Sequence, residues 1–311
     1  MLSTEEIIAL RGPKNTIDPL RPYAWLNEME MNASGELETY ATLFLSNAEC
    51  PFRCLMCDLW RNTTDQPVPL GAIPQQIEFG LAQLAAADSL KLYNSGNFFD
   101  VKAIAASEHA AIAELVRGFR RLVVENHPRL VGPQCVEFQH RIQPQLELAL
   151  GLETIHPEIL PELNKQMTVA DFSRAVEFLR AADIDVRVFV LLQPPGLEHE
   201  ESIEWAVRSV AFAFECGANC CSLIPVRQGN GALDELARRG LHREPTLAAM
   251  EIALHESLAL KAGRVVIDLW DAPRFATCDA CVVARVERLQ QINLTQQVCA
   301  QIQCNTCGLL A

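Results

Sequence analysis

Short apolar segments alternate with longer amphipathic stretches along most of the chain. Six segments are apolar at most of their positions, which is typical of strands buried on both faces of a parallel sheet. These expected strands are Thr39–Ser46, Leu90–Asn94, Arg121–Glu125, Gln145–Leu150, Asp185–Leu192 and Asn219–Pro225.

The stretches between these segments carry the start and stop signals of helices. Pro74 suits the first turn of a helix over residues 74–87. Thr168, with Asp171 three residues later, predicts the capped start of a helix over residues 168–182. Acidic residues open a third helical stretch, over residues 198–217, and Gly217 closes it. Alternating strands and helices predict a parallel sheet with right-handed crossovers.

The expected fold is α/β, a partial (β/α)6 TIM-type barrel with a C-terminal cysteine-rich, metal-binding extension. In such a barrel the chemistry gathers where the strands end. We divide the chain into an N-terminal extension (1–38), a barrel core (39–232) and a C-terminal extension (233–311). The last part contains a helix near Pro245–Ala262 and a strand at Arg264–Trp270.

Composition narrows the class of protein. The chain has 311 residues, of which 50% are hydrophobic and 21% charged, so it can bury a core large enough to exclude disorder as its main state. Its formal net charge of −13 argues against binding nucleic acid through its overall field. The sequence contains no apolar run long enough for a membrane span, and its first residues do not resemble a secretory signal. We therefore expect a cytoplasmic protein without a membrane partner.

Twelve cysteines are unusual for such a chain. Disulfides are rare in the cytoplasm, so ligation of a metal or cluster is the favoured interpretation. Eight of the twelve lie in two stretches, residues 50–57 and 278–307. The other four are expected to be core thiols: Cys135, Cys216, Cys220 and Cys221.

The first cysteine group follows the first expected strand, in SNAECPFRCLMCDLW. Cys50, Cys54 and Cys57 are separated by three and two residues. Three thiolates can bind a 4Fe–4S cluster and leave one iron without a protein ligand, free to take a small chelating molecule. A structural zinc site is the alternative, but zinc prefers four ligands in paired Cys-x-x-Cys units.

This stretch resembles the signature of the radical S-adenosylmethionine (radical SAM) superfamily, although Met56 stands where many members have an aromatic residue. The resemblance implies that the open iron chelates the amine and carboxylate of SAM. It also implies that an electron, from a donor such as a ferredoxin or flavodoxin, cleaves the sulfonium C–S bond. The resulting 5′-deoxyadenosyl radical would then abstract a hydrogen atom from the substrate.

The exit of the second strand reads LKLYNSGNFFD. By the same resemblance, Asn94, Ser95 and Gly96 are candidates for binding the amino group of SAM. An ordinary turn uses the same residue types, and that alternative stays open.

Acidic residues occur in or near the next two strands. Glu125 and Glu153 could bind the SAM ribose, or amines and hydroxyls of the substrate, if they face the barrel mouth. The alternative is a salt bridge with an arginine such as Arg187, which we include among the candidate cofactor-binding residues.

The second cysteine group lies near the C-terminus. Two Cys-x-x-Cys pairs, Cys278 with Cys281 and Cys304 with Cys307, predict one tetrahedral thiolate site. Zinc is the favoured occupant, and an auxiliary iron–sulfur cluster is the alternative. Cys299 is a fifth cysteine that could exchange with one of the four.

Several stretches together resemble one subgroup: YNSGNFFD, VVENHP, ALGLET, LNKQMTVADFSRAVEFLRAADIDVRVFVLLQPPG and IPVRQGNGALDEL. They are similar to the elongator-type radical SAM core, and most closely to the radical SAM subunit of archaeosine synthase, over roughly residues 39 to 310. That resemblance implies cleavage of a C–N bond in a lysine adduct of a 7-deazaguanine base in tRNA, together with a transglycosylase-like partner subunit. Because the chain is acidic, the partner would have to provide much of the affinity for tRNA.

Two further functions remain open at this point. A radical SAM enzyme acting on a small molecule or lipid precursor would suit the acidic surface. A non-enzymatic zinc- or cluster-bearing interaction protein is the other, and the repeated strand–helix units with polar strand ends argue against it.

Overall fold

The computed structural model describes residues 1–308, and its centre is one eight-stranded sheet in the order β1 to β8. Strands β2 to β8 are parallel to their neighbours, and β1 is antiparallel to β2. The strands are β1 (Ala24–Met31), β2 (Leu37–Phe44), β3 (Ser89–Tyr93), β4 (Arg121–Asn126), β5 (Gln145–Glu153), β6 (Asp185–Leu192), β7 (Cys220–Pro225) and β8 (Arg264–Ile267).

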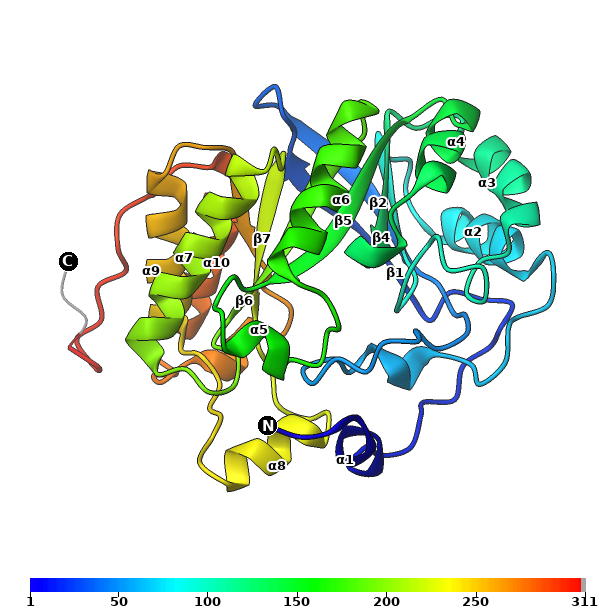
Figure 1. Ribbon diagram of the computed structural model, residues 1–311. Helices are drawn as coiled ribbons and strands as arrows, with labels where there is room; N and C mark the ends of the chain where they lie inside the picture. The colour runs from blue at the N-terminus through cyan, green and yellow to red at the C-terminus, as the bar shows by residue number, and fades with distance from the viewer. Residues whose placement is uncertain (309–311) are drawn as a thin grey trace.

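Helices cover the outside of the curled sheet (Figure 1), with α2, α3 and α4 on one flank and α7, α9 and α10 on the other. The helices are α1 (Thr4–Ala9), α2 (Ala72–Gln83), α3 (His109–Val116), α4 (Pro133–Arg141), α5 (Ile159–Glu162), α6 (Val169–Ala181), α7 (His199–Glu215), α8 (Ala232–Arg238), α9 (Leu247–Ala259) and α10 (Val282–Thr295). Four short 3-10 helices complete the described elements: η1 (Leu59–Asn62), η2 (Ala106–Glu108), η3 (Pro128–Leu130) and η4 (Ala272–Phe275).

The main core lies between the sheet and these helices. Alternate strand residues such as Leu43, Leu92 and Val188 face outward and are fully buried in one apolar cluster. The residues between them face the inside of the barrel, because successive side chains of a strand point to opposite faces. The inside of the barrel is therefore lined by a different set of strand residues from those in the outer core.

The predicted α/β partial barrel is confirmed. Each of the six expected strands overlaps one of β2 to β7, and the expected strand at Arg264–Trp270 is β8, which ends at Ile267. The predicted cap of α6 is also present, since Thr168 and Asp171 form a capping box. One strand was missed: β1 lies in the N-terminal extension, where inward-facing acids interrupt the apolar pattern.

The segments before residue 39 and after residue 232 each add a strand to the sheet of the barrel. Strand β1, from the first part, and strand β8, from the last, both belong to the same sheet as the barrel core. At the start of β8 the Arg264 Nη1 donates to the Met31 carbonyl at the end of β1, 2.7 Å away. The two extensions thus add the two edge strands of the barrel.

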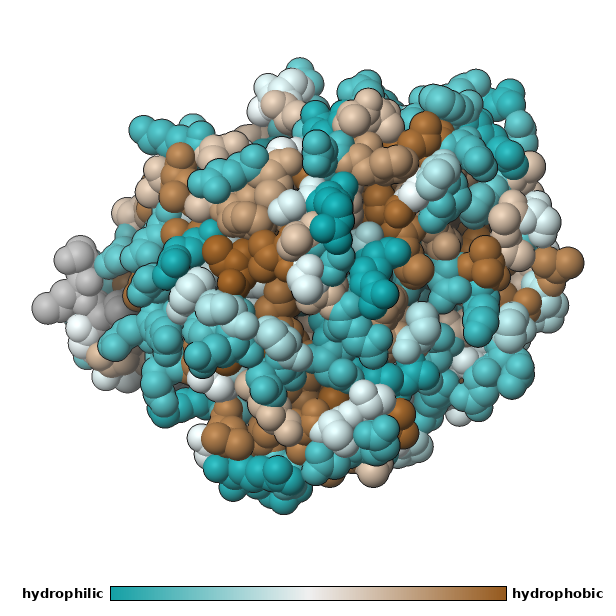
Figure 2. Space-filling model, viewed as in Figure 1, coloured by the Kyte–Doolittle hydropathy of each residue, from teal (hydrophilic) through white to brown (hydrophobic). Residues whose placement is uncertain are grey.

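A second, smaller apolar cluster lies where the strands end. Ile7 of α1, Ile159 of α5, and Leu233 and Leu236 of α8 are buried together there. In Figure 1, α1 and α8 lie at the lower end of the molecule with α5 above them, and Figure 2 shows hydrophilic residues on the outer surface of α8. The N-terminal residues and α8 therefore cap the barrel over the loop that follows β2.

Among the described residues, no helix has the length and apolar composition needed to cross a membrane.

Candidate functional site

The loop after β2 carries the first cysteine group, and we call residues 45–58 the cluster loop. Its first cysteine lies directly against the segment that follows β3. The Asn97 Nδ2 donates to the Cys50 Sγ at 3.1 Å. A Cβ added to Gly96 would lie 3.3 Å from the Cys50 Cβ, closer than most real contacts of this kind. The structure thus brings the predicted Asn94–Gly96 segment and the cysteine group together.

Buried contacts fix the rest of the cluster loop. Leu55 is fully buried in the second apolar cluster, and its backbone N–H donates to the Leu163 carbonyl at 2.9 Å. The Asn230 amide donates to the carbonyl of Leu55 at 2.8 Å and to that of Cys57 at 3.3 Å. On the other side, the Asn164 amide donates to the Arg53 carbonyl at 2.7 Å. These partners come from different strand exits, so the fold holds the loop in one conformation.

The two cysteine groups differ in the kind of metal site that they can form. Among the described residues, the only group of His, Cys, Asp or Glu placed to hold one metal ion is Cys278, Cys281, Cys304 and Cys307, whose sulfur atoms all lie within 4.8 Å of one another. The three cluster-loop cysteines do not form such a group in the described part of the chain. A multi-iron cluster binds each thiolate at a separate iron, so its cysteines need not converge on one ion.

Burial raises the pKa of all three cluster-loop thiols, and that of Cys54 to about 11. The positive charge of Lys165 acts in the opposite direction on Cys50 and Cys54. Buried thiols of this kind become thiolates when a cation binds them, since ligation removes the proton. The environment therefore suits ligands of a metal cluster better than free reactive thiols.

The backbone after β3 is shaped by Glu125. Its Oε1 accepts from the backbone N–H of Asn94 at 2.7 Å and from that of Gly96 at 3.2 Å. Burial raises the pKa of Glu125 to about 7, although those backbone donors act to lower it. Ser95 has a positive φ of 53°, and its hydroxyl bonds the Tyr23 hydroxyl at 3.0 Å. Glu125 thus shapes the candidate SAM-binding segment.

Two buried amides at the strand exits have unused polar atoms. Neither the oxygen nor the nitrogen of the Asn94 side chain has a hydrogen-bond partner in the described structure, although the residue is fully buried. The Gln193 Oε1, at the exit of β6, is in the same situation. A buried polar group without a partner costs about 1–3 kcal/mol, so a ligand or water that hydrogen-bonds these two amides would be stabilised there.

Glu153 lies at the exit of β5 with an unexpected partner. The Lys165 Nζ is 2.6 Å from its Oε1, and both side chains are only 8% exposed. Glu153 follows a register shift after Gly151 and has a positive φ of 69°, which turns it out of the strand. Sequence analysis missed Lys165. The only sequence signal for this site residue is that it is the one lysine in the short stretch between α5 and α6.

The placement of Arg187 corrects the sequence-based assignment. This arginine does not pair with Glu125 or Glu153, and it lies near the start of β6, away from the strand exits. It is 2% exposed and bonds Glu30 of β1 at 2.6 Å and Glu147 of β5 at 2.7 Å. Its role in the structure is to join strands across the inside of the barrel.

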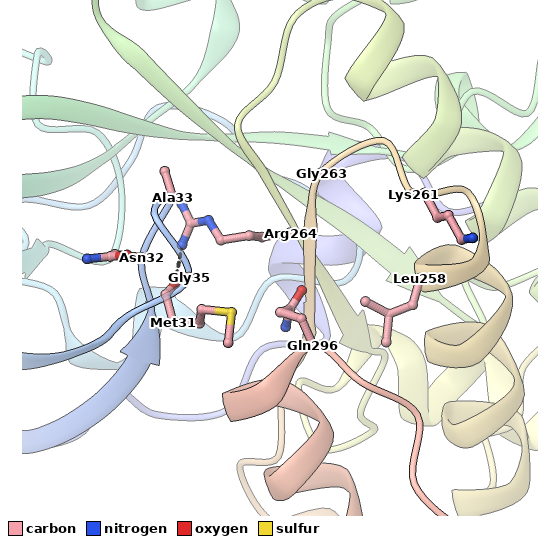
Figure 3. A pocket seen from close by; sticks show the side chains of 9 residues that line it. All are labelled: Met31, Asn32, Ala33, Gly35, Leu258, Lys261, Gly263, Arg264 and Gln296. Carbon is pink, nitrogen blue, oxygen red and sulfur yellow. Dashed lines mark hydrogen bonds between the residues drawn. The ribbon is translucent and has the colours of Figure 1, made fainter.

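The cavity in Figure 3 also lies away from the strand exits. It measures about 320 Å³ and opens between the turn that joins β1 to β2 and the start of β8. Arg264 and Gln296 line it, but their hydrogen bonds go to the backbone of β1, β8 and α10. The cavity therefore lies between the two edge strands, at the end of the barrel where the parallel strands begin.

The C-terminal cysteines form a compact group. The Cys278 Sγ lies 3.9 Å from that of Cys304, and the Cys281 Sγ lies 3.9 Å from that of Cys307. Tetrahedral ligands on bonds of about 2.3 Å lie about 3.8 Å apart, so this spacing suits one ion. Cys299 is not one of the four cysteines of this group, and its carbonyl accepts from the Arg288 guanidinium at 2.7 Å. The prediction that the two Cys-x-x-Cys pairs meet is confirmed.

Comparisons with known proteins agree with this architecture. No protein-family model matches the chain. It is 26% identical to archaeosine synthase subunit beta of Methanosarcina acetivorans over 261 residues, which cover 78% of this chain and 74% of that protein.

Two solved structures share the fold. The Elp3 protein of Methanocaldococcus infernus matches 72% of this chain with a TM-score of 0.53 at 14% identity. Coproporphyrinogen III oxidase of Escherichia coli, a radical SAM enzyme, matches 85% with a TM-score of 0.52 at 14% identity. The match covers 59% and 57% of those two chains. The chain has the radical SAM fold and is similar to archaeosine synthase subunit beta over most of its length.

Proposed function

We propose that the protein is a radical SAM enzyme that binds a 4Fe–4S cluster through Cys50, Cys54 and Cys57. The observation that carries this proposal is the position of the cluster loop. Its three cysteines follow the first parallel strand, and Cys50 lies against Gly96 and Asn97 of the next strand exit. Chemistry at the carboxyl ends of strands is the rule in barrels of this type.

The surrounding residues would prepare the site for such a cluster. When bound, the cluster supplies the electron that cleaves the C–S bond of SAM to give a 5′-deoxyadenosyl radical. The Asn97 side-chain N–H donates to the Cys50 sulfur and would stabilise negative charge there. Lys165 contributes a buried positive charge near Cys50 and Cys54.

The exits of β3 and β5 offer polar groups for SAM itself. The unpartnered Asn94 amide can both donate and accept beside the first cysteine. Lys165 and Glu153 now bond each other. When a ligand is present, Lys165 can also pair with its carboxylate, and Glu153 can also accept from its ribose hydroxyls. Together they match the polar groups of an amino acid and a ribose.

For the substrate, we propose a modified 7-deazaguanine base in tRNA, with cleavage of a C–N bond in its lysine adduct. Support comes from the similarity to archaeosine synthase subunit beta over 78% of the chain. With a net charge of −13, the chain itself is poorly suited to the phosphate backbone of tRNA. We therefore propose that a partner subunit presents the tRNA.

Anaerobic reconstitution with iron and sulfide tests this function. The protein should bind about four iron atoms in the cluster loop. With a reductant and SAM, it should release 5′-deoxyadenosine, which chromatography with mass spectrometry detects. Cys54→Ala should abolish this release, whereas Cys135→Ala, which changes a buried cysteine of the outer core, should retain it. Equal release from Cys54→Ala, or one zinc ion bound by these thiols, would overturn the proposal.

We further propose that the C-terminal group holds one zinc ion. The compact arrangement of the four thiols supports it. Elemental analysis should show one zinc per chain in the parent. A Cys304→Ser, Cys307→Ser variant should lose that zinc and keep the iron of the cluster loop. Loss of iron instead would identify an iron site in the tail.

A further inference from the structure

Four aromatic rings line the inside of the barrel next to the proposed SAM site. They are Tyr23, which precedes β1, Phe44 at the end of β2, Tyr93 at the end of β3 and Phe189 in β6, and we call them the aromatic row. Their ring centroids are 5.7, 5.9 and 6.5 Å apart in that order. The planes are tilted by 45°, 56° and 70°, so no ring covers the whole face of its neighbour.

The row is not part of the outer core. Phe98 and Phe172, which pack between sheet and helices, are completely buried, whereas all four residues of the row remain partly exposed to solvent. The direct neighbours of the row on its strands, such as Leu43 and Leu92, face the helices instead. The rings therefore face inward and retain surface that a ligand could cover.

A network of charges lies directly below the row. The Lys91 Nζ bonds Glu28 at 3.0 Å and also pairs with Glu30, while Arg187 joins Glu30 to Glu147. The interiors of barrels of this class are usually filled by branched aliphatic side chains. Here the side chain of Glu28 is still 35% exposed, so solvent reaches this network. Aromatic faces above and hydrogen-bonding groups below form an environment suited to binding.

The row also reaches the proposed radical source. The Ser95 hydroxyl bonds that of Tyr23 at 3.0 Å, and the next residue, Gly96, packs against Cys50. A group held on the row would thus lie beside the residues that we assign to SAM and the cluster.

We infer that the aromatic row is the substrate-binding wall and that it takes a planar heteroaromatic base with hydrogen-bonding edges. This inference rests on the proposed function, because it assigns the row to the same reaction. Stacking on aromatic side chains suits any such base, since every base has a flat π-face. The network beneath the row, Glu28 in particular, would accept from N–H groups on the edge of the base.

The test measures binding without reductant, so that it does not depend on SAM cleavage. The full-length, reconstituted protein is titrated with the nucleoside 7-deazaguanosine in the presence of SAM, and ligand-detected NMR gives the Kd. Tyr93→Leu and Phe189→Leu should each weaken binding about 5- to 150-fold, the loss of one stacked ring at about 1–3 kcal/mol. Tyr93→Phe keeps the ring and should bind nearly as well as the parent.

Trp25→Leu is the matched control. Trp25 lies on β1 but faces outward against Phe79 of α2, so its loss should leave the Kd unchanged. Circular dichroism verifies that each variant is folded, and the Phe189→Leu variant tests the row even if Tyr93→Leu fails to fold. Failure of the parent to bind the nucleoside, or equal affinity in Phe189→Leu and the parent, would overturn the inference. Ring-dependent binding without release of 5′-deoxyadenosine would support the row and refute the proposed SAM chemistry.

Discussion

Replacing Arg187 with methionine tests the most deeply buried ion network of the barrel. The guanidinium bonds Glu30 through Nη1 at 3.0 Å and Nη2 at 2.6 Å, and Glu147 through Nε at 2.7 Å. Arg187 is 2% exposed and Glu147 is completely buried. The substitution keeps an unbranched side chain of similar reach but removes the cation between two carboxylates.

The loss should be about 3 kcal/mol of unfolding free energy. Breaking a buried pair by removing one partner costs about 3–5 kcal/mol, because an uncompensated charge stays buried. The lower end applies here, since Glu30 keeps Lys91 and Glu147 keeps Arg121, 3.0 Å away. Adding Glu147→Gln to the variant removes one of the two unbalanced charges and should recover part of the loss.

Equilibrium urea unfolding, followed by far-ultraviolet circular dichroism, measures the effect at pH 7. Arg117→Met is the control, because it removes an exposed pair with Glu114 and should cost no more than about 1 kcal/mol. The affinity for SAM should stay unchanged, since Arg187 lies away from the strand exits. A loss below about 1 kcal/mol, or clearly weaker SAM binding, would refute a purely structural role for Arg187.

The same network sets a pH dependence. The cations around them hold the pKa of Glu30 and of Glu147 below the ordinary value, against the effect of burial. Their stabilising contribution is therefore complete above the unfolded-state pKa, about 4.3, and is lost as the pH falls through the lower native values. The parent should lose stability more steeply than Arg187→Met in acid, and parallel urea midpoints between pH 5 and pH 3 would contradict this.

Three further predictions concern the mouth of the barrel. Gly96→Val should lower the iron content and the release of 5′-deoxyadenosine several-fold, because its Cβ would press on Cys50; normal iron content would contradict the close packing. Because burial raises the pKa of Glu125 to about 7, the unfolding free energy should fall as the pH rises from about 4.5 to 7, and Glu125→Gln should flatten that slope in urea titrations. Deleting residues 1–10 should uncover Leu55 and speed the loss of cluster absorbance in air at least several-fold, whereas an unchanged rate would show that α1 does not shield the loop.

The parallel sheet could be predicted because its strands are short apolar runs bounded by turns and helices. Strand β1 could not be predicted, because its inward positions hold Glu28 and Glu30. Without knowledge of their partners, these charged residues indicate an exposed segment. The partner of Glu30 is Arg187, 157 residues away, and no local pattern reports a contact at that distance. The same limit explains why the sequence alone places Arg187 among the candidate cofactor-binding residues.

In the candidate site, too, some residues could be predicted from the sequence and others could not. Spacing alone pointed to Cys50, Cys54 and Cys57, since three thiols on one short loop can face one cluster. Lys165 could not be placed, because it reaches the site through left-handed backbone at Asn164 and Gln166, on either side of it. Nothing in the composition of that stretch predicts two departures from ordinary φ values around one residue.

The position of the ion network bears on how the barrel can bind a ligand at all. An interior filled with aliphatic side chains would be stable but closed, whereas buried ion pairs add little net stability over apolar packing of the same volume. The stability of this fold must therefore come mainly from the apolar layer between sheet and helices, in which Leu43, Leu92 and Val188 are fully buried. With that layer outside, the inner face is free to present aromatic rings and charges. Substitutions in the aromatic row should for this reason change binding far more than they change the unfolding free energy. The opposite result would show that those rings act as core residues.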